Sequence, residues 1–135
     1  MTINAKSTFV AMQRAARTMR DGGRIINISS LNTVMASPGV AVYAASKAAV
    51  EQFTRVAARE LGGRGITVNS ISPGATDTDL LRGTNSSESV RLAATMSPLG
   101  RLGTPADVAD VVGFLAGPDG RWMTGQNLHA SGGLA

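Results

Sequence analysis

Cysteine is absent from this sequence of 135 residues, and histidine occurs once. Without cysteine the chain has no disulfide framework and no thiolate ligand for a metal ion. Zinc sites and Ser-His-Asp triads both depend on histidine. The single one, His129, lies in a short apolar stretch, where we interpret it as a strand residue rather than a ligand. These absences exclude a disulfide-rich protein and argue against a metal site.

Aromatic and charged residues are also few, at 4% and 16% of the chain. The formal net charge of +4 comes from 13 Lys and Arg against 9 Asp and Glu, and the basic residues are spread along the sequence. Nucleic-acid surfaces combine clustered basic residues with stacking aromatics, and no such cluster occurs here. We therefore expect no nucleic-acid partner.

The sequence also has no long hydrophobic run. Lys6, Arg14 and Arg17 interrupt residues 1–20, which argues against a signal peptide. No stretch approaches the roughly 20 apolar residues of a membrane span. The hydrophobic content of 43% is that of a globular protein. We expect a single cytoplasmic domain with its own core and no membrane partner.

Hydrophobic periodicity predicts an alternation of strands and helices. Strands are predicted at 24–29, 66–71 and 126–130, and helices at 3–20, 41–62, 90–96 and from 105 to a stop at 117. This order leads to an α/β fold with a parallel sheet and helices on both faces. The last helix has the clearest start, because Thr104 suits the N-cap, Pro105 the first helical position and Asp107 the positive helix end.

The apolar positions of the two long helices are expected to face the core. In the first helix they are Ala5, Phe9, Met12, Ala16 and Met19. In the second helix they are Ala49, Val50, Phe53, Val56, Ala57 and Leu61.

Tyr43 and Lys47 form the clearest chemical motif. Four residues apart on a helix, their side chains share one face. A free phenol is a poor acid or base at neutral pH, and a lysine cation held close favours the phenolate. The pair therefore has the properties of a general acid/base.

A hydroxyl that could hold a substrate oxygen lies just upstream, at the polar end of the first strand. Ser29 and Ser30 both qualify, and Ser30 is thirteen residues before Tyr43. Asn4 lies in the first turn of the first helix, where a polar residue is common for capping alone.

Together these residues resemble the active site of the short-chain dehydrogenase/reductase family, which contains an Asn, a Ser and a Tyr-x-x-x-Lys motif. The matching residues here are Asn4, Ser30, Tyr43 and Lys47. The resemblance implies that Tyr transfers the proton and a nicotinamide cofactor the hydride, while Ser steadies the carbonyl or alcohol oxygen. It also implies that Lys holds the nicotinamide ribose and tunes Tyr, and that Asn supports a water leading to Lys.

The resemblance extends to the segment after the second strand. Pro73-Gly74 is similar to the family's Pro-Gly turn, and Thr78 to the threonine four residues later. With Thr76 between them, these residues are expected to hold the nicotinamide end of NAD or NADP. The Tyr-x-x-x-Lys spacing with Ser30 indicates a small carbonyl or alcohol substrate, because enoyl reductases of the family usually space Tyr and Lys more widely.

The resemblance covers only the C-terminal half of a family member. A complete Rossmann-like domain begins with a strand, a glycine-rich turn and a helix that binds the pyrophosphate, and no such turn is present here. The residues that choose between NAD and NADP would lie upstream, so this sequence does not indicate which of the two cofactors is preferred. We expect a partial doubly wound sheet, with residues 1–135 as one C-terminal portion.

Two interpretations stay open for this chain. It is either part of an oxidoreductase, expected to be inactive by itself, or a non-catalytic remnant that serves as an oligomerisation or interaction module. In the family, the two long helices form the main dimer contact, which implies a homodimer or homotetramer. The first strand is expected to be an exposed edge that recruits other chains.

Overall fold

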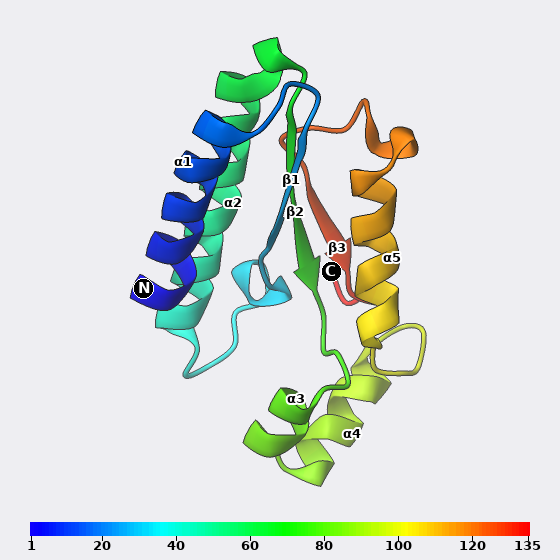
Figure 1. Ribbon diagram of the computed structural model, residues 1–135. Helices are drawn as coiled ribbons and strands as arrows, with labels where there is room; N and C mark the ends of the chain where they lie inside the picture. Colours follow the sequence, from blue (N-terminus) through cyan, green and yellow to red (C-terminus); the bar gives the residue numbers. More distant parts are fainter.

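The computed structural model describes residues 1–135 and contains one three-stranded sheet. Its strands are β1 (Arg24–Ile28), β2 (Thr67–Pro73) and β3 (Asn127–Ala130), in the order β1-β2-β3. Both pairs are parallel, with Ile28 opposite Ile71 and Ile71 opposite Leu128 (Figure 1). The predicted α/β fold is confirmed, with β1 at an edge of the sheet.

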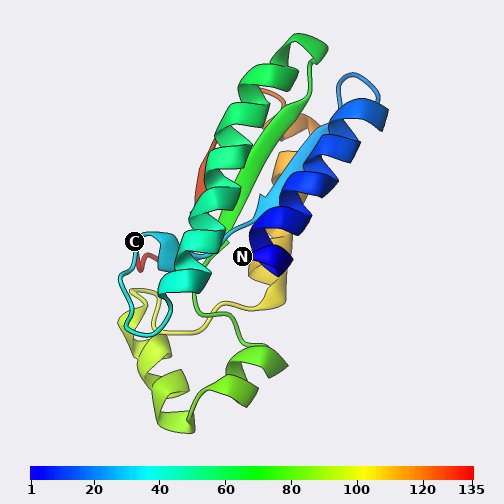
Figure 2. The same ribbon diagram turned by 90° about the vertical axis from the view of Figure 1, so that its left-hand side faces the viewer.

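Helices cover both faces of this sheet. On one side α1 (Ser7–Thr18) and α2 (Ala41–Leu61) lie next to each other, and on the other side lies α5 (Pro105–Ala116) (Figures 1 and 2). The sequence predicted a helix from residue 3, but the structure begins differently. Thr2–Lys6 form a π-helical turn that runs into α1. None of the helices combines the length and apolarity needed to cross a membrane.

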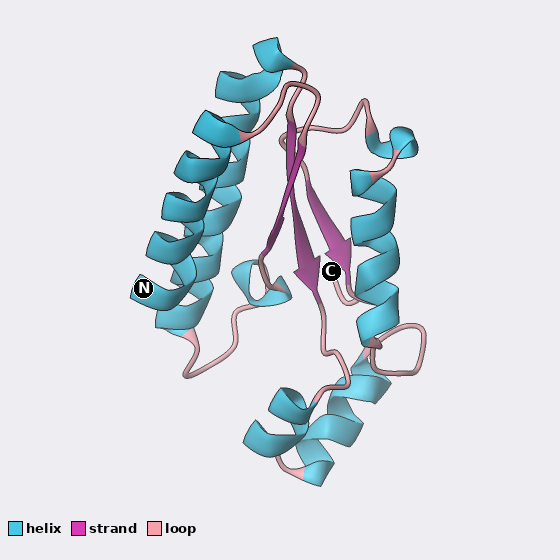
Figure 3. Ribbon diagram, viewed as in Figure 1, coloured by secondary structure: helices cyan, strands magenta, loops and turns pink.

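Two short helices lie beyond the carboxyl ends of the strands, α3 (Asp79–Thr84) and α4 (Ser87–Met96) (Figure 3). Only α4 was predicted. Each begins with a hydroxyl cap, since Thr78 Oγ accepts from Leu81 N at 3.2 Å and Ser86 Oγ from Ser89 N at 3.2 Å. A helix as short as α3 has too few turns to show a helical period, and its capping residue gives the only signal in the sequence.

The apolar core lies between β1, β2, α1 and α2. Its buried members are Met12, Ile25, Ala58, Leu61, Ile66 and Val68. Burial of a large apolar side chain of this kind stabilises the fold by about 1.5–3 kcal/mol. The core therefore holds the helix pair against the sheet mainly at the amino ends of the strands.

The predicted buried face of α2 was partly wrong. Val56 is 44% exposed, whereas polar residues share the buried face. The buried residues of α2 are Ser46, Val50, Glu51, Thr54, Ala58 and Leu61. The apolar side chains of Phe53, Val56 and Ala57 instead line a groove of about 310 Å³ together with Phe9 and Met12 of α1. Helix α2 thus has an apolar side toward α1 and a mixed side toward the sheet.

Candidate active site

A cleft of about 1050 Å³ opens at the carboxyl ends of the strands. This edge of an open parallel sheet is where α/β proteins bind ligands. The cleft brings together seven of the eight predicted site residues: Ser30, Tyr43, Lys47, Pro73, Gly74, Thr76 and Thr78. They come from the end of β1, the start of α2 and the segment after β2, so the fold assembles them from three separate parts of the chain.

Tyr43 and Lys47 project from the first turns of α2 toward this cleft. Tyr43 is 41% exposed, and the Nζ atom of Lys47 lies 6.0 Å from the centre of its ring. The same Nζ atom donates a hydrogen bond of 3.0 Å to the carbonyl oxygen of Ile28 at the end of β1. The ammonium group is therefore held next to the phenol by the strand as well as by the helix.

Ser29 and Ser30 lie in different environments. Ser29 is 3% exposed and donates from Oγ to Glu51 Oε1 at 2.7 Å and to Lys47 O at 3.2 Å. Ser30 is half-buried at the cleft, where its Oγ accepts from Asn32 N at 3.3 Å. A hydroxyl that accepts one weak bond still has its proton to donate. Of the two serines, Ser30 is the one available to a ligand.

Asn4 is the predicted site residue that does not line the cleft. Its Nδ2 donates to Ser46 Oγ at 3.1 Å, and Ser46 Oγ donates to the carbonyl oxygen of Tyr43 at 2.6 Å. The backbone carbonyl oxygen of Asn4 accepts from Thr8 Oγ in the first turn of α1 at 2.7 Å. Asn4 therefore supports the Tyr43 turn of α2 from behind, and its predicted role toward a water and Lys47 stays a prediction.

The segment after β2 needs glycine at one position. Gly74 N donates to Ala130 O at 2.9 Å, which brings the turn against the end of β3. A Cβ at Gly74 would lie 3.0 Å from Ser131 Cα, so any side chain would push the two segments apart. Thr76 Oγ then donates to Gly74 O at 3.1 Å, and Thr78 caps α3. Close packing thus fixes the Pro73-Gly74 turn along one wall of the cleft.

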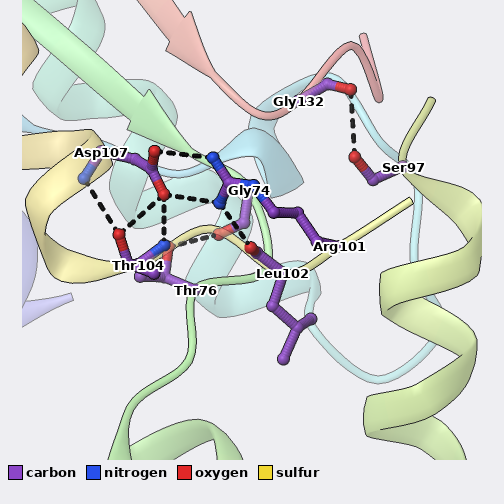
Figure 4. A network of polar contacts seen from close by, with 8 residues as sticks. All are labelled: Gly74, Thr76, Ser97, Arg101, Leu102, Thr104, Asp107 and Gly132. Carbon is purple, nitrogen blue, oxygen red and sulfur yellow. Dashed lines mark hydrogen bonds and ion pairs between the residues drawn. The ribbon is translucent and has the colours of Figure 1, made fainter. Parts of the chain in front are cut away.

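The loop before α5 braces this segment from the other side. Thr76 forms an isolated parallel bridge with Gly103, and Asp77 N donates to Gly103 O at 2.8 Å. Arg101 binds both carboxylate oxygens of Asp107 at 2.7 and 2.8 Å (Figure 4). Asp107 also accepts from the backbone and hydroxyl of Thr104, and because Asp107 N donates to Thr104 Oγ at 3.3 Å the predicted N-cap residue forms a capping box.

These contacts shift the titration of the exposed ion pairs. The bidentate bond to Arg101, followed by the bonds from Thr104, holds the pKa of Asp107 well below its usual range. The hydrogen bond to Asp107 in turn raises the pKa of Arg101. On the far side of the segment, the bond from Arg82 lowers the pKa of the Asp77 carboxyl.

The remaining walls of the cleft are mostly apolar and carry no charge. Tyr43 and Lys47 are the only ionisable residues that line it. The apolar contributors from the helices and the C-terminal end are Leu80, Leu81, Ala93, Met96, Val108 and Leu134.

A buried polar network behind the cleft was missed by the sequence analysis. Glu51 Oε1 accepts from Ser29 and, at 3.3 Å, from Ser72. Ser72 also donates to Asn127 Oδ1 at 3.0 Å, as Ser70 does. No local pattern marks this network, because Ser29 and Ser72 lie more than 20 residues from Glu51 in the sequence.

Comparison with known proteins identifies the relatives of this chain. The family model for enoyl-(acyl carrier protein) reductase matches residues 1–135. An NADPH-dependent aldehyde reductase-like chloroplastic protein of Arabidopsis thaliana is 42% identical over 134 residues, which are 98% of this chain and 50% of that protein. The chain thus spans about half the length of the curated relatives it matches.

Solved structures agree with this match. A blue fluorescent protein from a metagenomic library, in complex with NADPH, superposes with a TM-score of 0.93 at 45% identity. The match covers 100% of this chain and 54% of that one. The angucycline C-6 ketoreductase LanV with bound NADP has a TM-score of 0.90 at 47% identity, covering 97% and 51%. The chain belongs to the short-chain dehydrogenase/reductase family of oxidoreductases.

Proposed function

We propose that this chain carries the catalytic half of an NADPH-dependent carbonyl reductase. The observation that supports it most is the convergence of Ser30, Tyr43 and Lys47 in one cleft beside the Pro73-Gly74 turn. A general acid, a hydroxyl donor and a cation at the end of a parallel sheet suit reduction of a carbonyl group.

Each residue has a defined task in this proposal. Ser30 Oγ donates a hydrogen bond to the substrate carbonyl oxygen and aims it at Tyr43. The Tyr43 hydroxyl gives its proton to that oxygen, and the Lys47 ammonium, 6.0 Å from the ring centre, favours the phenolate that results. Proton donation completes the alcohol once hydride has reached the carbonyl carbon.

The nicotinamide cofactor supplies that hydride when bound. The residues present suit its neutral carboxamide and ribose, because the segment offers hydroxyls and backbone groups and no charge. Thr76 and Thr78 would hold the carboxamide together with the Pro73-Gly74 backbone, and Lys47 the ribose. NADPH is proposed over NADH because both solved relatives hold NADPH or NADP.

The substrate is proposed to be a neutral, largely apolar carbonyl compound. Apart from Tyr43 and Lys47 the cleft has no ionisable wall residue, so beyond the reach of Lys47 a carboxylate or phosphate on the substrate would lose water without gaining a charged partner. The matched family model is named for enoyl reduction, but the Tyr43–Lys47 spacing together with Ser30 favours carbonyl chemistry.

The nucleotide-binding half is proposed to come from another segment of the same protein or from a second polypeptide. In this chain the outer edge of β1 is unpaired, and Ile28 is 45% exposed. The apolar groove between α1 and α2 favours a second copy as a further partner, giving a homodimer or homotetramer. The same groove is the feature that favours the alternative function, a non-catalytic oligomerisation module.

The test compares this chain with the longest reading frame that contains it. We expect the longer protein to oxidise NADPH with a neutral apolar ketone, and the 135-residue chain to bind NADPH weakly and sediment as an oligomer. A monomeric chain with micromolar NADPH affinity would contradict the proposed need for a second half. A longer protein that binds NADPH but reduces no ketone would favour the non-catalytic alternative.

Substrate class is tested with a matched substrate pair. The carboxylate derivative of the same ketone should show about 10²-fold lower kcat/KM, because its charge meets an uncharged wall. Met96 is 52% exposed at the end of α4 and lines the cleft, so it offers a matched pair of variants. Met96→Lys should reduce the difference in kcat/KM between the ketone and its carboxylate derivative, whereas Met96→Gln should leave this difference unchanged. Equal activity of the parent on both ketones would overturn the substrate proposal.

A further inference from the structure

Glu51 is a buried acid that has no cationic partner. It is 8% exposed and lies one helical turn after Lys47 on α2. The ion pairs of this structure join Arg64 to Asp21, Arg82 to Asp77 and Arg101 to Asp107, and none includes Glu51. A buried carboxyl group is costly unless hydrogen bonds satisfy it. The bonds that Glu51 accepts therefore indicate why an acid occupies this position.

A single oxygen of Glu51 joins two neighbouring strands. Oε1 accepts from Ser29 Oγ at 2.7 Å, and it shares the single hydroxyl proton of Ser72, at 3.3 Å, with Asn127 Oδ1 at 3.0 Å. Ile28 and Ile71 are partners in the parallel register, so Ser29 and Ser72 are the next residues of their strands. The backbone joins them as well, because Ser29 N donates to Ile71 O at 2.7 Å. Glu51 thus ties the carboxyl ends of β1 and β2 to α2.

The residues that follow these two serines face the ligand. Ser30 comes directly after Ser29, and Pro73-Gly74 directly after Ser72. Ser29 Oγ also lies 3.2 Å from the carbonyl oxygen of Lys47, so the same network reaches the helical turn that carries the lysine. Ser30 and Pro73 are therefore each one residue away from a bond in this network, and Lys47 takes part in it through its carbonyl oxygen.

Apolar packing would fill the space between α2 and the two strand ends without setting the separation of those ends. At the opposite end of the sheet, Ile66 and Val68 pack against α2 through contacts without direction. Hydrogen bonds depend on distance and angle, so they set the separation of two strand ends more closely. We infer that Glu51 is a positioning residue, which holds the Ser30 hydroxyl at a fixed separation from the Pro73-Gly74 turn. This inference rests on the proposed reductase function.

The decisive variants differ in whether residue 51 can accept a hydrogen bond. Glu51→Gln keeps an oxygen at the Oε1 position and should keep kcat within a few-fold of the parent. Glu51→Leu has no acceptor and should lower kcat by about 10²-fold, the loss expected when reacting groups shift by about 1 Å. KM for NADPH should rise by a smaller factor than kcat falls, because Lys47 keeps its contact with Ile28 O while the Pro73-Gly74 turn shifts.

A matched control separates positioning from stability. Thr54 lies on the same buried face of α2, accepts from Asn27 Nδ2 at 2.9 Å and makes no bond to a strand end at the cleft. Thr54→Val should lower the melting temperature as Glu51→Leu does, yet leave kcat unchanged. If both variants lose kcat in proportion to stability, Glu51 is only structural and the inference fails.

Amide hydrogen exchange tests the inference independently of activity. In the 135-residue chain, Glu51→Leu should speed exchange at Ser29, whose N–H donates to Ile71 O, and at Gly74 at least about tenfold, while Val68 near the start of β2 changes little. Unchanged exchange at Ser29 and Gly74 would overturn the inference whether or not the protein reduces ketones. A parent that shows this exchange pattern but no reduction would instead count against the proposed function alone.

Discussion

The two ends of the sheet pack against α2 in different ways. At the amino ends of the strands, Ala58 and Leu61 meet Ile25, Ile66 and Val68 in an apolar cluster. At the carboxyl ends, Glu51 meets the hydroxyls of Ser29 and Ser72. Helix α2 and the sheet thus make an apolar contact at one end and a hydrogen-bonded contact at the other.

This difference separates two tasks within a small fold. Apolar contacts supply stability, and they tolerate small shifts as long as volume is conserved. Hydrogen-bonded contacts add less net stability, but they specify position, and a functional site needs its supporting side chains held in one geometry. Variants at the two ends should therefore affect different observables.

The largest effect is expected at the carboxyl end, from Tyr43→Phe. Phenylalanine keeps the ring but removes the transferable proton, so turnover by the longer protein should fall by about 10²–10⁴-fold. The melting temperature and NADPH affinity should stay close to those of the parent, because the hydroxyl belongs to no packed contact. Turnover within a few-fold of the parent would exclude Tyr43 as the general acid.

The converse variant lies at the amino end. Ile66 is 1% exposed in the apolar cluster, so Ile66→Ala should lower the free energy of unfolding by about 2–5 kcal/mol. Turnover per folded molecule should change little, since the cleft lies at the other end of β2. Urea denaturation combined with active-site titration checks both parts. A large loss of kcat in the folded fraction would show that the two ends are coupled.

The sequence predicted most of the fold because its local signals were strong. An apolar run with a polar end marked β1 and alternating apolar residues marked β2, and the Thr104-Pro105 start of α5 appears as a full capping box. The spacing of Tyr43 and Lys47 placed them on one side of α2, and both line the cleft. These features depend on residues close together in the chain, which a sequence pattern can reveal.

Features that depend on contacts between distant segments were harder to predict. The sequence analysis gave Glu51 no role, and only the register of β1 and β2 brings Ser29 and Ser72 to it. Val56 was predicted to face the core but lines the groove beside α1. In both cases the neighbours that decide burial are far away in sequence, and for Val56 the helical period alone assigned the wrong face.

The smallest effect is expected at Asp107, on the loop that braces the Thr76 segment. Its pKa is lowered chiefly by Arg101 and then by Thr104, so the folded state prefers the ionised form more than the unfolded state does. The stability that this gives is present above the unfolded carboxyl pKa of about 3.9 and is lost as pH falls toward the lower folded value.

Asp107→Asn should therefore unfold at a slightly lower urea concentration than the parent at pH 7, and the difference should shrink between about pH 4 and pH 2. Added salt should reduce the difference at pH 7, because both partners are exposed and their attraction is screened. Arg101→Gln, which removes the other partner, should reproduce the same pH dependence. A constant difference at all pH values would mean that Asp107 acts only as a neutral cap, and that the carboxyl end of the sheet owes nothing to this ion pair.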